Sequence, residues 1–139
     1  MTKPPYVYLV EDDADDRFMM QQAFAEMNFS NQLKMFNSSE LFLSYTTSVT
    51  DPTCLPSLFV LDFNMPVING GELLLKLKQH DLLKTIPVVL YSTGMRTILK
   101  ETLIAAGALD CFEKASDYHE LCKQAQTFRL IAEGNGVLY

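Results

Sequence analysis

The sequence predicts an α/β fold in three layers, in which helices cover both faces of a five-stranded parallel sheet. Five short apolar segments alternate with stretches whose apolar residues recur every three or four positions. Such alternation favours a parallel sheet, because right-handed crossovers place helices on both of its faces. The 139 residues suit one (βα)5 domain. We expect a single domain over 1–139, with its core at about 6–133 and a short tail at 134–139.

Two strand–helix units are expected first. Tyr6–Val10 is a short apolar run and predicts a strand buried on both faces. The apolar face of the helix after it would be Met20, Ala23, Phe24 and Met27. Leu33–Phe36 is the second strand, and Asn37 with Glu40 predicts a capping-box-like start to the next helix. That helix would carry Leu41, Phe42 and Tyr45. Residues 46–56, rich in Thr, Ser, Asp and Pro, are expected to form a loop.

Three further units complete the predicted fold. Strands are expected at 58–61, 88–91 and 108–112. Gly70 and Gly71 would open a helix that turns Leu73, Leu74 and Leu77 to one side. The next helix would span 98–106 and end at Gly107, since glycine is common just after a helix. The core positions of the last helix, which stops near Gly134, would be Leu121, Ala125, Phe128 and Ala132.

Charge and cysteine content exclude several classes of protein. The net charge of −6 argues against direct nucleic-acid binding, which needs clustered Lys and Arg. No apolar run approaches the roughly 20 residues that span a bilayer, so we expect no membrane insertion and a cytoplasmic location. Cys54, Cys111 and Cys122 are odd in number and widely spaced, which favours reduced, packed thiols over disulfides.

Polar side chains gather where the predicted strands end, and this edge of a parallel sheet is where ligands bind. The residues are Glu11, Asp12, Asp62, Ser92, Thr93 and Lys114. Three carboxylates at one place repel one another, so a cation is expected. Oxygen ligands favour Mg²⁺, whereas the lack of His or Cys among them disfavours zinc. Acids such as Asp13, Asp15 and Asp16 are better explained as stabilising the start of the next helix.

A lysine and a hydroxyl beside these acids would suit a phosphoryl group, which needs a positive charge and hydrogen-bond donors. Asp62 follows the central strand and is the expected nucleophile that would form an acyl phosphate. Ser92, Thr93 or Lys114 taken singly would be weak indications, because single polar residues at strand ends are commonly solvated. The prediction therefore depends on their joint placement.

Four motifs resemble the receiver domain of two-component response regulators, and the resemblance covers Val7 to about Ala132. The motifs are Tyr8–Asp13, Leu61–Gly70, Pro87–Ser92 and Gly107–Lys114. The resemblance implies a flavodoxin-like fold and a stand-alone regulator that catalyses only its own phosphorylation and dephosphorylation. It also implies a sensor histidine kinase, a phosphotransfer protein or a small phosphodonor as the source of the phosphoryl group. A downstream protein would be the target, and a homodimer is possible.

The resemblance also implies a role for each site residue. Asp62 would accept the phosphoryl group, and Mg²⁺ would be held by Glu11, Asp12, Asp62 and the backbone carbonyl of Asn64. Lys114 would pair with the phosphoryl oxygens, and Ser92 would move to hydrogen-bond them. This movement would shift the face formed by the fourth helix, the fifth strand and the fifth helix. The Asn64 side chain would lie where water approaches and tune hydrolysis.

Two positions depart from the family pattern. Cys111 stands where an aromatic residue usually moves with the switch hydroxyl, and Phe112 follows it. Ala115 replaces the proline that usually follows the lysine, so we expect a trans peptide bond there. These departures motivate the main rival function, that of a receiver-like scaffold that binds a partner without phosphorylation.

An enzyme and a nucleotide-binding module are both disfavoured. A haloacid-dehalogenase-type phosphatase needs a second aspartate where Asn64 stands. A flavodoxin-like nucleotide binder needs a phosphate-cradling first loop, but residues 11–16 are acidic here.

Overall fold

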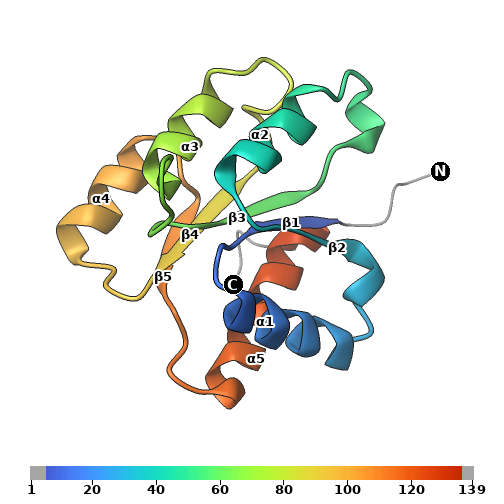
Figure 1. Cartoon of the computed structure of the whole chain (residues 1–139), viewed down its shortest axis with the longest axis vertical. Coiled ribbons are helices and arrows are strands. Elements are labelled where there is room, and N and C mark those ends of the chain that lie inside the picture. Colours follow the sequence, from blue (N-terminus) through green and yellow to red (C-terminus); the bar gives the residue numbers. More distant parts are fainter. Residues whose placement is uncertain (1–5, 136–139) are drawn as a thin grey trace.

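The structure, a computed structural model, describes residues 6–135 and has the predicted architecture. Its five parallel strands lie in the order β2-β1-β3-β4-β5 (Figure 1). The strands are β1 (Val7–Val10), β2 (Leu33–Phe36), β3 (Leu58–Asp62), β4 (Val88–Ser92) and β5 (Asp110–Glu113). Because every strand runs the same way, all five carboxyl ends meet at one edge of the sheet. Most of the predicted tail, residues 136–139, lies outside the described residues.

Five helices connect and follow the strands, in two layers. They are α1 (Ala14–Glu26), α2 (Ser39–Thr47), α3 (Gly70–Lys78), α4 (Thr97–Ala105) and α5 (Tyr118–Leu130). Figure 1 shows α1 and α5 on one face of the sheet, and α2, α3 and α4 on the other. A π-helical turn, Ile131–Asn135, follows α5, and Gly134 within it has a positive φ of 89°. The last helix therefore stops near Gly134, as predicted.

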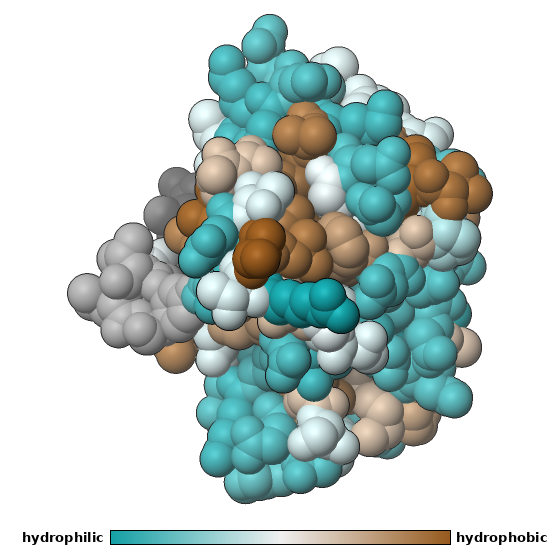
Figure 2. Space-filling model, turned by 90° about the vertical axis from the view of Figure 1, so that its left-hand side faces the viewer, coloured by the Kyte–Doolittle hydropathy of each residue, from teal (hydrophilic) through white to brown (hydrophobic). Residues whose placement is uncertain are grey.

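Alternation along the central strands builds two cores. Tyr8 and Val10 face the layer of α2, α3 and α4, whereas Val7 and Leu9 face α1 and α5. All residues of β1, β3 and β4 are buried, as expected for strands covered on both faces. Figure 2 shows one face of the exterior, on which hydrophilic and hydrophobic residues are mixed. Helix α3 places its three predicted core leucines against this sheet with no exposed surface; they are Leu73, Leu74 and Leu77. Each fully buried leucine stabilises the fold by about 1.5–3 kcal/mol.

The prediction for α2 was wrong about its N-cap and about where the helix ends. Its N-cap is Ser38, whose side chain accepts a hydrogen bond from the Leu41 amide, so Asn37 does not cap the helix. Leu41 and Tyr45 are 58% and 44% exposed, and the buried face consists of Ser39, Phe42 and Thr46. The helix also extends to Thr47, into the predicted loop, and a 3₁₀ turn at Pro52–Cys54 occupies part of the rest.

The other departures from expectation are small. The fifth strand begins at Asp110, two residues later than predicted, after Gly107 ends the preceding turn with a φ of 118°. The three cysteines are free, as expected, but Cys54 is exposed and only Cys111 is fully packed. No cis peptide bond occurs within residues 6–135, so the bond before Ala115 is trans, as predicted. Within the same range, no helix is long and apolar enough to cross a membrane.

Candidate functional site

The carboxyl ends of β1, β3, β4 and β5 carry the predicted site residues. Glu11 and Asp12 follow β1, Asp62 ends β3, and Ser92 ends β4. Parallel pairing sets Asp62 opposite Tyr91, next to Ser92, and Lys114 follows the last residue of β5. The register of the sheet therefore brings residues more than 100 positions apart in the sequence to one edge.

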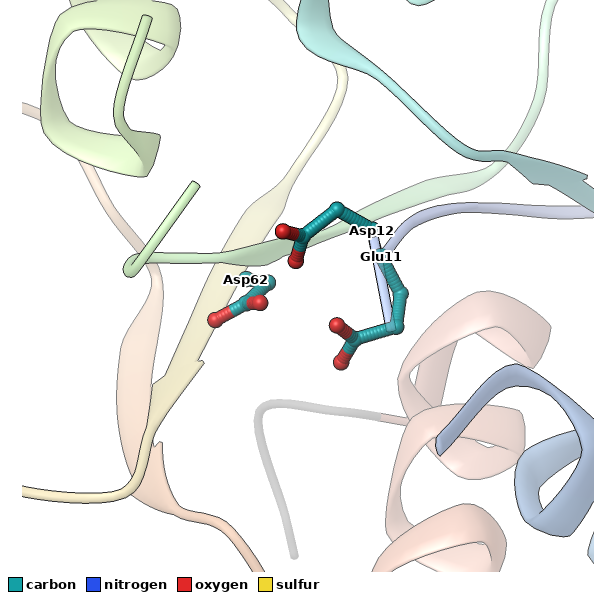
Figure 3. Close-up of side chains that lie close together, drawn as sticks. All are labelled: Glu11, Asp12 and Asp62. Atoms are coloured by element: carbon teal, nitrogen blue, oxygen red, sulfur yellow. The ribbon is translucent and has the colours of Figure 1, made fainter. Parts of the chain in front are cut away.

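Three of these residues form a carboxylate cluster. One carboxylate oxygen each from Glu11, Asp12 and Asp62 lies within 4.8 Å of the others. Figure 3 shows the three side chains turned toward a shared space, two from the segment after β1 and one from the end of β3. Glu11 and Asp62 are buried, while Asp12 is exposed. A hard divalent cation that keeps part of its water shell, such as Mg²⁺, fits oxygen ligands that open to solvent on one side.

Glu11 is the most enclosed of the three acids. Its Oε1 accepts a hydrogen bond from the Tyr91 hydroxyl at 2.5 Å, and its Oε2 accepts one from the Asp13 amide at 3.1 Å. Burial raises the pKa of Glu11 to about 7; Asp62 also raises it, whereas the Tyr91 hydrogen bond lowers it. Tyr91 stays protonated, since burial and the charge of Glu11 raise its pKa well above the ordinary value. A nearby cation would favour the ionised form of Glu11.

Lys114 joins the carboxylates through three contacts. Its Nζ lies 3.0 Å from Glu11 Oε1, 3.0 Å from Asp16 Oδ2 and 3.4 Å from Asp62 Oδ2. It also lies 5.1 Å from the centre of the Tyr91 ring. Burial lowers the pKa of Lys114, but the bonds to Asp16 and Glu11 and the nearby charges outweigh burial and raise it overall. The lysine is therefore a fixed positive charge beside Asp62.

Ser92 is buried and bonded to the segment after β3. Its Oγ accepts a hydrogen bond from Asn64 Nδ2 at 2.7 Å and another from the Gly94 amide at 3.3 Å. The backbone N–H of Asn64 donates a hydrogen bond to Asp62 Oδ1 at 3.0 Å, which keeps the Asn64 backbone beside the Asp62 carboxylate. Thr93 is exposed, and no hydrogen bond described for residues 6–135 joins its side chain to the cluster. Of Ser92 and Thr93, the two hydroxyl residues predicted for the site, only Ser92 thus lies within it.

Hydrogen bonds of the Asp13 and Arg17 side chains fix the segment between β1 and α1. Asp13 is the N-cap of α1, and its side chain accepts a hydrogen bond from the Asp16 amide at 2.9 Å. Arg17 Nη1 donates to the carbonyl oxygens of Glu11 and Asp12, at 2.9 Å in each case. The capping role predicted for Asp13 is confirmed. These bonds hold the backbone that carries two of the three clustered acids.

Sequence reasoning missed two contributors to the site. Asp16 was interpreted only as a helix-start residue, yet its side chain contacts Lys114. Tyr91 was interpreted only as part of a buried strand, yet its hydroxyl binds Glu11. The available signal was weak: a buried tyrosine needs a partner for its hydroxyl, but the sequence does not say which. The position of Asp16 three residues after the cap places it in the first turn of α1 without fixing its side-chain direction.

The sheet order, the two helical layers and the acidic site at the carboxyl edge define a flavodoxin-like α/β protein. Residues 7–126 match the family model described as the response regulator receiver domain. The chain belongs to this family.

Two curated proteins are similar to this chain in sequence. A probable methanogenesis regulatory protein, FilR2 of Methanothrix harundinacea, is 28% identical over 92 residues, which are 66% of this chain and 59% of FilR2. The chain thus spans less than two thirds of that relative. Response regulator Rcp1 of Synechocystis is 27% identical over 128 residues, covering 88% of this chain and 85% of Rcp1.

Two solved structures share the fold at lower identity. The phosphorylated cyanobacterial phytochrome response regulator RcpA superposes with a TM-score of 0.79 at 23% identity, covering 93% of this chain and 94% of RcpA. The Mn²⁺-bound form of Rcp1 gives a TM-score of 0.75 at 24% identity, with 91% of this chain and 93% of Rcp1 covered.

Cys111 and Phe112 lie on opposite faces of β5, because successive side chains of a strand alternate. Cys111 is buried in the core beneath α3 and α4, whereas Phe112 packs on the opposite face of the sheet. The Phe112 ring lies edge-on to that of Phe128 in α5, with 5.6 Å between centroids. The aromatic residue of β5 therefore belongs to the α5 layer, away from the side on which Cys111 lies.

Proposed function

We propose that the chain is a phosphoacceptor response regulator, in which Mg²⁺-dependent phosphorylation of Asp62 switches a protein-binding surface. The observation that carries the proposal is the contact of Lys114 Nζ with both Glu11 and Asp62 inside the carboxylate cluster. A lysine held there supplies the point charge that a phosphoryl group on Asp62 requires. Family membership supports the same function.

Each site residue has a part in this proposal. Glu11, Asp12, Asp62 and the Asn64 carbonyl would hold Mg²⁺, which would offset the negative charge of both the carboxylate and the incoming phosphoryl group. A carboxylate oxygen of Asp62 would bond to phosphorus while the bond from phosphorus to the donor nitrogen breaks. Lys114 would bind the phosphoryl oxygens. Ser92 would leave Asn64 and donate its hydroxyl proton to one of those oxygens.

The switch would act on other proteins. We propose that a sensor histidine kinase or phosphotransfer protein supplies the phosphoryl group in the cytoplasm, and that a downstream protein reads the face of α4, β5 and α5. The charge event at Asp62 would bias that face between two states. Beyond its own phosphoryl transfer and dephosphorylation, the chain would not act as an enzyme.

Intact-mass measurement after incubation with acetyl phosphate and Mg²⁺ tests the phosphorylation. We expect one added phosphoryl group in the native chain, none when Mg²⁺ is removed, and none in Asp62→Asn. Asp81→Asn is the matched control, because Asp81 has a side chain that is 97% exposed and lies outside the cluster. An adduct that persists in Asp62→Asn would place the acceptor elsewhere.

The rival function is that of a scaffold that binds its partner without phosphorylation. Two departures from the family pattern favour it: buried Cys111 stands where the usual aromatic residue would couple Ser92 to the output face, and Ala115 replaces the usual proline. The two functions separate in the same experiment. No adduct with acetyl phosphate, together with no spectroscopic response to beryllofluoride, would decide for the scaffold.

Replacing the lysine tests the switching step separately from metal binding. In Lys114→Ala the three acids that would bind Mg²⁺ remain, so we expect Mg²⁺ affinity to be retained. We expect the amide shifts of α4, β5 and α5 on adding beryllofluoride to be lost, since the variant lacks the ammonium group that would bind the phosphoryl analogue beside Mg²⁺. NMR titration measures both, and native-like shifts in the variant would contradict the role of Lys114.

A further inference from the structure

Lys114 contacts one carboxylate, that of Asp16, which has no part in the proposed reaction. A lysine ammonium has three N–H donors, and three different carboxylates lie around this one. The two shorter contacts, both 3.0 Å, go to Glu11 and Asp16, and the longest, 3.4 Å, goes to the proposed acceptor Asp62. A phosphoryl group on Asp62 would bring new anionic oxygens, which would compete with these carboxylates for the three donors of Lys114.

The carboxylates of the two shorter contacts, Glu11 and Asp16, differ in burial, and this difference indicates which one Lys114 would leave at the lower cost. The Glu11 side chain is fully buried, so losing the lysine would leave a charge that water cannot reach. The Asp16 side chain is 46% exposed, and water can replace the lysine there at little cost. Asp16 also adds negative charge beside the position that the phosphoryl group would occupy. Both effects make Asp16 a competitor of the phosphoryl group for Lys114.

The space around the pair allows it to separate. A cavity of about 150 Å³ lies between α1 and the segment that joins β5 to α5. Asp16 and Lys114 both line this cavity, together with Met20, Tyr91 and Tyr118. The backbone of Asp16 is fixed by the Asp13 cap, so its side chain can turn away without unwinding α1.

We propose that Asp16 is a positioning residue that holds Lys114 in the unphosphorylated protein and opposes its transfer to the phosphoryl group. Asp16 thereby lowers the affinity of the site for the phosphoryl group. This inference rests on the proposed function, since it needs Asp62 to be the acceptor.

Beryllofluoride affinity, measured at saturating Mg²⁺, tests the inference. We expect Asp16→Asn to bind about fivefold more tightly than the native chain, which is the effect of losing one partly exposed ion pair. Asp15→Asn is the matched control: it removes the same charge from the same helical turn, but Asp15 is exposed and makes no ion pair within residues 6–135. We expect less than about a twofold change there. Asp16→Glu restores the carboxylate and should return the affinity toward the native value.

The outcomes are distinct. Weaker binding by Asp16→Asn would mean that Asp16 prepares Lys114 for the phosphoryl group, and equal gains in Asp15→Asn and Asp16→Asn would mean a general charge effect; either result overturns the inference. If native protein binds beryllofluoride and gains a phosphoryl group while Asp16→Asn is unchanged, only the inference fails. If no variant responds and no adduct forms, the proposed function fails and the inference fails with it.

Discussion

Val67 adopts a backbone conformation that β-branched residues rarely take. It lies between Asp62 and α3, has a φ of 68° and is 80% exposed. The left-handed region places the Cβ atom close to the backbone, which costs about 1–2 kcal/mol per residue. Exposure leaves little packing to offset that cost. The turn that carries the end of β3 into α3 therefore contains local strain.

Replacing Val67 by asparagine should relieve this strain. Asparagine tolerates the left-handed region, and little packing is lost at so exposed a position. We expect Val67→Asn to raise the free energy of unfolding by about 1 kcal/mol, measured by urea denaturation. Val67→Ala is the control, since alanine lacks the polar side chain whose local hydrogen bonds let asparagine tolerate this conformation. Equal effects of the two substitutions would show that backbone strain is not the cause.

The sequence predicted most of the residues that lie at the site, but it did not predict which of their side chains contact one another. The end of each strand located Glu11, Asp62 and Lys114 at one edge, because parallel strands align their carboxyl ends. The same reasoning could not assign Asp16 to Lys114. That contact depends on the rotation of α1 relative to the segment after β5, which arises only when both pack on the sheet.

Helix starts illustrate the same limit at the scale of elements. The α3 prediction was accurate because its leucines repeat at helical spacing and glycine marks its start. Asn69 caps it, with the reciprocal bond from the Asn69 amide to Glu72. In α2, two polar residues face the core, each with its hydroxyl bonded to a backbone carbonyl: Ser39 to Ile68 and Thr46 to Phe42. Hydropathy periodicity cannot indicate a polar residue that is buried with its hydrogen bond made.

Gly70 provides a test at the junction of β3 and α3. A Cβ atom there would lie 2.7 Å from the Asp62 carbonyl oxygen and 2.8 Å from Phe63 Cα, both backbone atoms that cannot move aside alone. We expect Gly70→Ala to lower the free energy of unfolding by more than about 2 kcal/mol. Gly94→Ala is the control, because a Cβ atom at Gly94 would meet nothing within 4 Å. Calorimetric unfolding of both variants measures the difference, and similar stabilities would contradict the close approach.

At the scale of the whole molecule, the fold collects negative charge at one edge. Five acids lie at positions 11–16, and the remainder of the chain carries a net charge of only −1. Glu11 and Asp62 are buried there beside Lys114. The alternation of strands and helices predicted the order of the layers, because crossover handedness leaves few topologies. It could not predict the cost of burying these charges, which depends on their final separations.

A cation that binds this edge should stabilise the entire fold. We expect Mg²⁺ at about 100 times its dissociation constant to add about 2.7 kcal/mol to the free energy of unfolding, raising Tm by roughly 10 °C. Thermal unfolding with and without Mg²⁺ measures the shift. Asp12→Asn should abolish most of it, since Asp12 is exposed and can be changed without disturbing the core. Asp81→Asn should keep it, and a native-size shift in Asp12→Asn would exclude this cluster as the binding site.

The central place of β3 in the sheet has a consequence for where motion can occur. Strand β3 is hydrogen-bonded on both sides, to β1 and β4, and all of its residues are buried. Its amide protons should exchange with deuterium only when the domain unfolds globally, whereas edge strands β2 and β5 open more readily. The proposed acceptor, Asp62, thus lies on a strand that opens only with global unfolding. We therefore expect structural adjustment to a phosphorylated Asp62 to occur toward the edges of the domain.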